Sequence, residues 1–96
     1  MKIIYTPLSK KNLIKIKLYI KKDSTNRANL FISKLKNQIE NLINSPYKFR
    51  QSDYYNDENI RDMVFNGYTI IYKIDKIENL ITILEIFNKN LPQLEE

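Results

Sequence analysis

The chain has 96 residues, 43% of them hydrophobic, so length and composition predict one soluble globular domain over residues 1–96, with a modest core. It contains no cysteine and no histidine, which excludes disulfides, thiolate chemistry, zinc-finger sites and Ser-His or Cys-His catalysis. The net charge of +5 is uneven: residues 1–50 carry twelve basic and two acidic side chains (+10), and residues 51–96 carry four and nine (−5).

This charge distribution predicts a basic surface formed by the first half of the chain. Such a surface attracts an acidic protein or nucleic acid, although a solvated lysine face explains the same composition. No apolar run approaches the ~20 residues that a membrane helix needs, and lysines interrupt the N-terminal region in which a signal peptide needs an apolar stretch. We therefore expect a cytoplasmic protein with no membrane partner, no metal and no cofactor.

The first predicted elements are a strand and a helix. Residues 2–5 (KIIY) are rich in β-prone side chains, and Thr6 followed by Pro7 is typical of a helix N-cap and first helical position. The predicted helix extends to Lys22, and apolar residues recur on one of its faces at helical spacing: Leu13, Ile16, Tyr19 and Ile20.

A second apolar ridge, Ile14 and Leu18, lies among the lysines of this helix. Either a neighbouring element packs over the ridge or a partner binds it, and packing is the interpretation that we favour. The surrounding basic surface consists of Lys10, Lys11, Lys15, Lys17, Lys21 and Lys22. It is a candidate for contact with an acidic protein or with nucleic acid.

The second predicted helix follows a polar break in which Asp23 or Ser24 can serve as the N-cap. It ends before Pro46, because proline disfavours helical geometry in the residue that precedes it. Its apolar positions have helical spacing: Ala28, Phe31, Ile32, Leu35, Ile39, Leu42 and Ile43. With so short a break, the two helices should form an antiparallel hairpin with their apolar faces inward.

Residues 46–58 show no clean period, and their aromatic and basic side chains alternate: Tyr47, Lys48, Phe49, Arg50, Tyr54 and Tyr55. Aromatic rings interleaved with cations can stack on unpaired bases. A loop that closes over the edge of the core would use the same rings for packing, and we favour packing.

The strongest local signal is Asn66-Gly67, which lies between two β-prone runs and predicts a two-residue type I′ turn. That turn fixes the register, so that Phe65 faces Tyr68 and Arg61 faces Tyr72. One sheet face is then apolar apart from Arg61, and the other is mixed. A turn at residues 76–79 precedes the nearly continuous apolar run 80–87, which predicts a central strand covered on both faces or nearly so. The tail beyond residue 87 holds Pro92 and predicts irregular structure.

The predicted order is β-α-α-β-β-β, an α+β fold in which a helical hairpin packs on a small, mainly antiparallel sheet. The ordered residues of these elements resemble the RelE/ParE superfamily of type II toxin–antitoxin toxins over essentially the whole chain. The matching positions are Leu13, Ile16, Tyr19, Ile20, Ser24, Ala28, Phe31, Leu35, Ile39, Leu42, Ser45, Pro46, Arg50, Ile60, Arg61, Gly67, Tyr68, Ile70, Ile71, Tyr72, Ile81, Ile83, Leu84 and Ile86.

The resemblance implies a small cytoplasmic toxin that a cognate antitoxin neutralises, and a complex that binds operator DNA only through the antitoxin. RelE-type members cut mRNA on the ribosome, whereas ParE-type members inhibit DNA gyrase. The positions at which RelE-type enzymes carry sheet cations fall here on Ile60, Asp62 and Val64, none of which is basic. Near the C-terminus only Lys89 is basic, and no tyrosine follows Tyr72.

We therefore expect a ParE-like toxin, with no catalytic residue assigned and the question of enzymatic activity left open. The target-binding candidates are Arg61, Tyr72, Lys73, Arg50 and Lys89. Arg61 also has a structural interpretation, in which it stacks on Tyr72 and binds a carboxylate. The alternatives are a RelE-like ribosome-dependent mRNA endonuclease and a basic nucleic-acid-binding module outside any toxin system.

Overall fold

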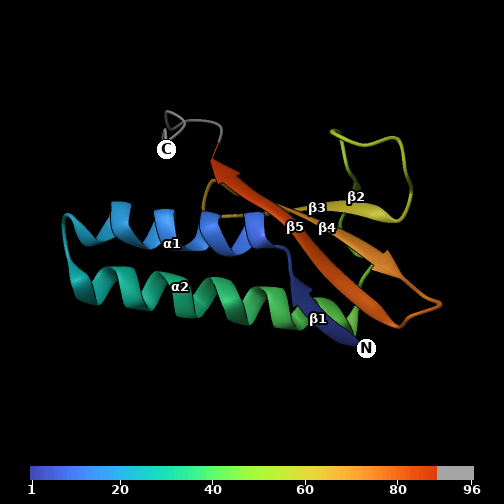
Figure 1. Ribbon diagram of the computed structural model, residues 1–96, viewed down its shortest axis with the longest axis horizontal. Helices are drawn as coiled ribbons and strands as arrows, with labels where there is room; N and C mark the ends of the chain where they lie inside the picture. The colour runs from blue at the N-terminus through green and yellow to red at the C-terminus, as the bar shows by residue number, and fades with distance from the viewer. Residues whose placement is uncertain (89–96) are drawn as a thin grey trace.

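The computed structural model describes residues 1–88. In chain order its elements are β1 (Lys2–Tyr5), α1 (Pro7–Lys21), α2 (Thr25–Glu40), the 3-10 helix η1 (Asn41–Asn44), β2 (Arg50–Gln51), β3 (Ile60–Phe65), β4 (Tyr68–Asp75) and β5 (Leu80–Asn88) (Figure 1). This order confirms the predicted β-α-α-β-β-β arrangement. The two-residue strand β2 is the one addition, and it lies in the segment for which the sequence gives no period.

The sheet has five strands in the order β1-β5-β4-β3-β2. The β1 and β5 strands are parallel, whereas the other neighbouring pairs are antiparallel. The helical hairpin lies along one side of this sheet (Figure 1). The β5 strand is interior, as predicted, but β4 is the central strand. The residues of β5 that face away from the helices are half-buried, so only its helix-facing side is fully covered.

The β3–β4 turn has the backbone conformation that the sequence predicts. Both Asn66 and Gly67 have positive φ, 49° and 85°, as a type I′ turn requires. The register also follows the prediction, since Phe65 pairs with Tyr68 and Arg61 pairs with Tyr72. Because this register fixes which side chains face the helices, the tight turn determines the composition of both sheet faces.

Both helices begin at the predicted caps. The Thr6 hydroxyl accepts a hydrogen bond from the Ser9 backbone N–H (3.0 Å) and donates one to the Leu84 carbonyl (2.9 Å). The Ser24 hydroxyl accepts a hydrogen bond from the Arg27 backbone N–H (3.2 Å). The Thr6 cap therefore both starts α1 and fastens it to β5.

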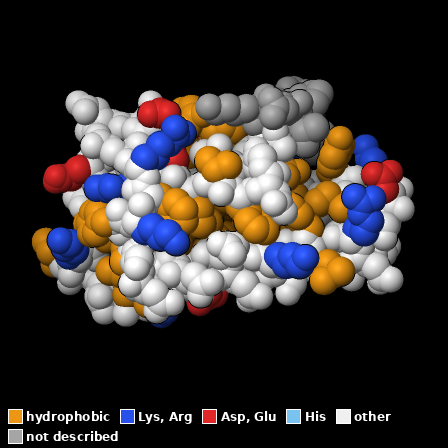
Figure 2. Space-filling model, turned by 180° about the vertical axis from the view of Figure 1, so that it is seen from behind, with side chains coloured by type: hydrophobic (Ala, Val, Ile, Leu, Met, Phe, Trp, Pro, Cys, Tyr) orange, Lys and Arg blue, Asp and Glu red, His pale blue; other side chains and the backbone are white. Residues whose placement is uncertain are grey.

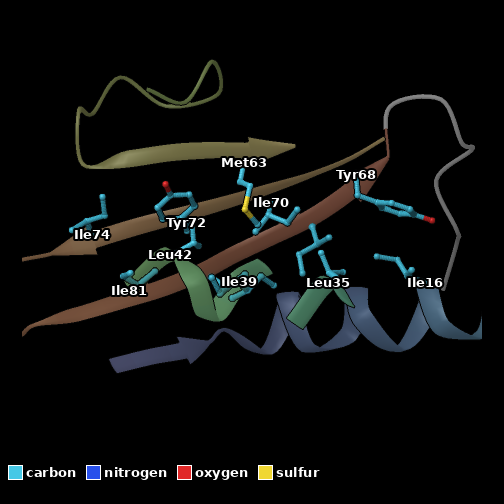
Figure 3. Packing of buried hydrophobic residues seen from close by; sticks show 12 residues of the cluster. Ile16, Leu35, Ile39, Leu42, Met63, Tyr68, Ile70, Tyr72, Ile74 and Ile81 are labelled. Atoms are coloured by element: carbon cyan, nitrogen blue, oxygen red, sulfur yellow. The ribbon is translucent and has the colours of Figure 1, made fainter. Parts of the chain in front are cut away.

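The core lies between the hairpin and the sheet. In Figure 3, Leu35 and Ile39 of α2 point toward the sheet residues Met63, Ile70 and Tyr72. All five side chains are at most 1% exposed. No helix within residues 1–88 has the length and apolar character needed to cross a membrane.

The ridge formed by Ile14 and Leu18 does not enter this core. Their exposed fractions are 61% and 55%, whereas Ile16 on the opposite side of α1 is 7% exposed. The expectation that a neighbouring element packs over the ridge is therefore wrong. The inward side of α1 meets β5 and α2, and the ridge points away from both.

Candidate functional site

The sheet face that points away from the helices, here called the outer face, holds the three positions at which the resemblance places the sheet cations of RelE-type enzymes. These positions lie at alternate residues of β3: Ile60, Asp62 and Val64. Ile60 and Asp62 are buried, and Val64 is 59% exposed. An aliphatic residue, a carboxylate and a second aliphatic residue therefore occupy this row.

The basic side chains of the outer face are separated from one another. By strand alternation, the face receives Lys2 from β1, Arg50 from β2 and Lys73 from β4. Lys73 pairs with Ile60 on one side and with Thr82 on the other, and neither residue is charged. On the side of the molecule opposite to the view of Figure 1, Figure 2 shows Lys and Arg side chains scattered among apolar ones.

Arg50 is held by two carboxylates. Its Nη1 lies 3.1 Å from Asp53 Oδ2, and its Nη2 lies 3.5 Å from Asp62 Oδ2. The same Asp62 oxygen accepts a hydrogen bond from the Asp53 backbone N–H (3.1 Å). Asp62 Oδ1 is buried and has no hydrogen-bond partner among residues 1–88. A phosphate that approached this point would meet a buried carboxylate and a cation whose charge is already compensated.

Within residues 1–88, Arg61 binds backbone carbonyls and no carboxylate, whereas the structural interpretation supposed a carboxylate partner. Its Nε donates to the Glu58 carbonyl (2.9 Å), and its Nη1 donates to the Phe49 carbonyl (3.0 Å). The guanidinium lies over the ring of Tyr47, 4.9 Å from the centroid, and not over Tyr72. The Nζ of Lys76 lies 5.0 Å from the same ring centroid. Arg61 thus fastens the segment before β3 to the sheet.

Tyr72 is fully buried on the helix-facing side of β4. Its hydroxyl donates a 2.6 Å hydrogen bond to the Pro46 carbonyl at the end of the helical region. Burial raises the pKa of this hydroxyl from 10.0 to about 12, although the nearby Arg61 guanidinium acts to lower it. Tyr72 therefore contributes to the core and offers no surface to a target.

The raised pKa makes stability depend on pH in the alkaline range. The folded protein keeps the Tyr72 proton to a higher pH than the unfolded chain does. The corresponding stability is fully present below pH 10 and is lost as pH rises through about 12.

We expect Tyr72→Phe to lower the free energy of unfolding near neutral pH by about 1–2 kcal/mol, because the Pro46 carbonyl loses its hydrogen-bond donor. Its stability should then fall less steeply above pH 10. Urea denaturation of both proteins across this range measures the difference, and parallel pH profiles would contradict the assignment.

The aromatic loop is partly packed, as favoured. Tyr47 and Phe49 pack against the core cluster, and the Tyr47 hydroxyl donates to Asn59 Oδ1 (2.6 Å). Tyr54 meets the Phe87 ring edge-on, with a centroid separation of 5.3 Å. Tyr54 and Tyr55 nevertheless keep 44% and 43% of their surface exposed.

The four target-binding candidates within the described residues do not form one patch. Arg61 and Tyr72 are cross-strand neighbours on the helix-facing side, whereas Arg50 and Lys73 belong to the outer face. Lys89 lies outside the described residues. The sequence pattern identified Arg61 as unusual, but its bonds to the Phe49 and Glu58 carbonyls depend on the path of the aperiodic loop.

The predicted basic surface of α1 does exist. Helical geometry places Lys10, Lys17 and Lys21 on one side of the Ile14–Leu18 ridge, and Lys11, Lys15 and Lys22 on the other. Five of these lysines are exposed and Lys15 is half-exposed.

Among residues 1–88, no three acidic side chains lie close enough together to hold a metal ion.

Comparison with known proteins gives a consistent result. Residues 3–90 match the family model described as the ParE toxin of the type II toxin–antitoxin system parDE. A P. aeruginosa structure of a chromosomal ParDE system has a TM-score of 0.73 at 14% identity, covering 92% of this chain and 95% of that one. No curated protein matches.

Two E. coli structures share the fold. A RelE toxin mutant bound to a RelB antitoxin peptide has a TM-score of 0.65 at 13% identity, covering 93% of this chain and 83% of that one. The intact RelBE toxin–antitoxin complex has a TM-score of 0.60 at 15% identity, covering 93% and 96%. At these identities, the three structures establish the fold alone.

Proposed function

The chain belongs to the ParE toxin family of type II toxin–antitoxin systems, and from this premise we propose that it acts by binding and inhibiting DNA gyrase. A cognate antitoxin neutralises it in the cytoplasm. The toxin reaches operator DNA only through that antitoxin.

The composition of the outer face is the observation that carries the proposal. Cleavage of RNA without histidine requires another general base to take the proton of the 2′-hydroxyl, and cations that stabilise the charge that develops on the phosphate. Here Arg50 is paired with Asp53 and Asp62, and Lys73 stands two strands away on β4. This arrangement supports action by binding over action by RNA cleavage.

The solved structures with a similar fold support a neutralising partner. The three similar structures come from ParDE and RelBE toxin–antitoxin systems, and one of them holds a RelB peptide. The +10 charge of residues 1–50 in this chain suits an acidic partner.

A RelE-like ribosome-dependent nuclease is the second candidate, because two of the three similar structures contain RelE. A basic nucleic-acid-binding module outside any toxin system is a third hypothesis, which rests on the exposed Tyr54 and Tyr55 in the same loop as Lys48 and Arg50. An antitoxin-like reading frame directly beside this one would favour either toxin over this module.

Supercoiling by purified gyrase tests the proposal. We expect the purified chain to inhibit supercoiling, and we expect pre-incubation with the product of the adjoining reading frame to restore it. A matched control uses the Leu35→Ala protein, whose core is damaged. Supercoiling that proceeds normally at every toxin concentration would refute gyrase as the target.

A further inference from the structure

The segment between β2 and β3, residues 52–58, folds back over the outer face of the sheet (Figure 1). The backbone N–H of Asp53 donates to Asp62 Oδ2 (3.1 Å), and the Tyr54 ring meets the Phe87 ring edge-on. Phe87 belongs to β5, so Tyr54 reaches past β3 and β4 to make this contact. The segment therefore adds aromatic side chains to the outer face, at the end that carries the β3–β4 turn.

An exposed aliphatic side chain stands beside this aromatic pair. Val64, Thr69 and Phe87 are paired residues of β3, β4 and β5, and strand alternation directs all three side chains away from the helices. Val64 is 59% exposed, Tyr54 is 44% exposed and Phe87 is half-buried. Cross-strand neighbours lie about 4.5–5.5 Å apart at Cβ. Val64, Phe87 and Tyr54 therefore form one apolar strip, here called the Val64–Phe87 row.

The charge around this row is negative. Residues 51–72 contain only one basic side chain, Arg61, which faces the helices, and four acidic ones: Asp53, Asp57, Glu58 and Asp62. Asp53 and Asp62 share one cation, Arg50, so these three side chains together keep a formal charge of −1. Asp62 Oδ1 also lacks a hydrogen-bond partner within residues 1–88. A partner that carries cations would meet uncompensated negative charge here.

We propose that the Val64–Phe87 row binds a basic segment of the target protein. An apolar side chain of that segment covers Val64 and the edge of the Phe87 ring. Its lysines or arginines meet the carboxylates and the exposed ring surface of the tyrosines of residues 52–58. The inference rests on the proposed function for the existence of a protein target. It adds which surface of the toxin that target binds and the chemistry of the target's contact segment.

The sign of the charge favours a basic protein over other classes of partner. The phosphates of DNA or RNA, and the anionic headgroups of a membrane, would approach carboxylates that repel them. A neutral apolar partner would desolvate Asp53 and Asp62 without supplying a second cation. An enzyme that binds DNA carries cations on its surface. Tyrosine and phenylalanine are enriched where proteins contact one another.

Position 64 allows the apolar and electrostatic contributions to be separated. Val64 is exposed on a strand, so lysine and glutamate fit there at a similar, small cost to folding. Val64→Lys removes the aliphatic contact and repels a basic segment, whereas Val64→Glu removes the same contact and attracts that segment. The difference in affinity between the two variants therefore shows the sign of the partner's charge.

Binding of the full-length chain to purified gyrase, measured by biolayer interferometry, tests the proposal. At low salt we expect Val64→Lys to weaken binding by about 10–100-fold and Val64→Glu by no more than about fivefold. The difference between these affinities should narrow as salt rises, because ions screen exposed charges.

The matched control is Ile77→Lys, which introduces the same cation far from the row. Ile77 is 93% exposed in the turn between β4 and β5, at the other end of β4. This variant should bind gyrase within about twofold of the wild type. Circular dichroism of each variant checks that folding is intact.

Three results would contradict the proposal. If Val64→Lys bound as tightly as the wild type, the inference would be overturned while gyrase remained the target. Equal losses in Val64→Lys and Val64→Glu at low salt would also overturn it, because the partner would then not be basic. If the wild type did not bind gyrase at all, the proposed target and this inference would both fall.

Other occupants of the row give distinguishable results. If Val64→Lys abolished self-association in analytical ultracentrifugation and left gyrase binding unchanged, a second copy of the chain would be the occupant and the proposal would fail. The chain's own residues 89–96 follow β5 and include Leu91 and Leu94. If Leu91→Ser/Leu94→Ser tightened gyrase binding tenfold or more, that segment would be the occupant and the proposal would fail as well.

Discussion

Arg61→Ala should lower the free energy of unfolding by about 2–3 kcal/mol. The substitution removes two hydrogen bonds from a charged group, one to the Glu58 carbonyl and one to the Phe49 carbonyl. It also removes a cation from the face of the Tyr47 ring. The guanidinium is half-exposed, so the expected loss stays below the sum of these interactions in a buried site. Urea denaturation measures it.

Two further variants test whether the role of Arg61 is structural. Arg61→Lys keeps the charge but cannot reproduce the two directed bonds, so it should recover little of the lost stability. Arg27→Ala, at an exposed position of α2, should change stability by no more than about 0.5 kcal/mol. We also expect Arg61→Ala to reduce toxicity or antitoxin binding more than Lys89→Ala does. Equal and small effects of both substitutions would contradict this account of Arg61.

Leu35→Ala should destabilise the protein more than Arg61→Ala does, lowering the free energy of unfolding by about 2–5 kcal/mol. Leu35 is fully buried at the centre of the helix–sheet interface, so its truncation leaves a cavity between α2 and the sheet. Each kcal/mol corresponds to about 4–8 °C in Tm for a domain of this size. Thermal denaturation is therefore a sensitive measurement.

The matched control stands on the same helix. Leu30→Ala removes the same atoms from a side chain that is 59% exposed, and it should change stability by no more than about 0.5 kcal/mol. Similar losses for Leu30→Ala and Leu35→Ala would show that α2 does not present Leu35 to the sheet as the structure describes.

Most of the fold could be predicted from local signals. The Asn66-Gly67 pair fixes a turn type, the turn type fixes the β3–β4 register, and the register sorts the side chains between the two faces. The helix caps at Thr6 and Ser24 are equally local, since each hydroxyl bonds the backbone three residues later. The short strand β2 could not be predicted, because its two residues acquire strand geometry only by pairing with β3.

The candidate site was less predictable because it depends on contacts between distant residues. The bond from Arg61 to the Phe49 carbonyl spans twelve residues of aperiodic chain. The Tyr72 hydroxyl finds the Pro46 carbonyl across twenty-six residues. Helical periodicity located Ile14 and Leu18 on a second ridge, but periodicity does not reveal whether another layer covers that ridge. Structure decides this, and it leaves both residues exposed.

Primer-extension mapping of an mRNA on translating ribosomes, with the purified chain added, tests the central claim most directly. With Arg50 compensated by Asp53 and Asp62, and with Ile60 and Val64 beside them, we expect the message to stay intact at every toxin concentration that stops gyrase. Toxin-dependent cuts within the ribosome-bound codon, abolished by Arg50→Ala or Lys73→Ala, would show that these separated cations do support RNA cleavage.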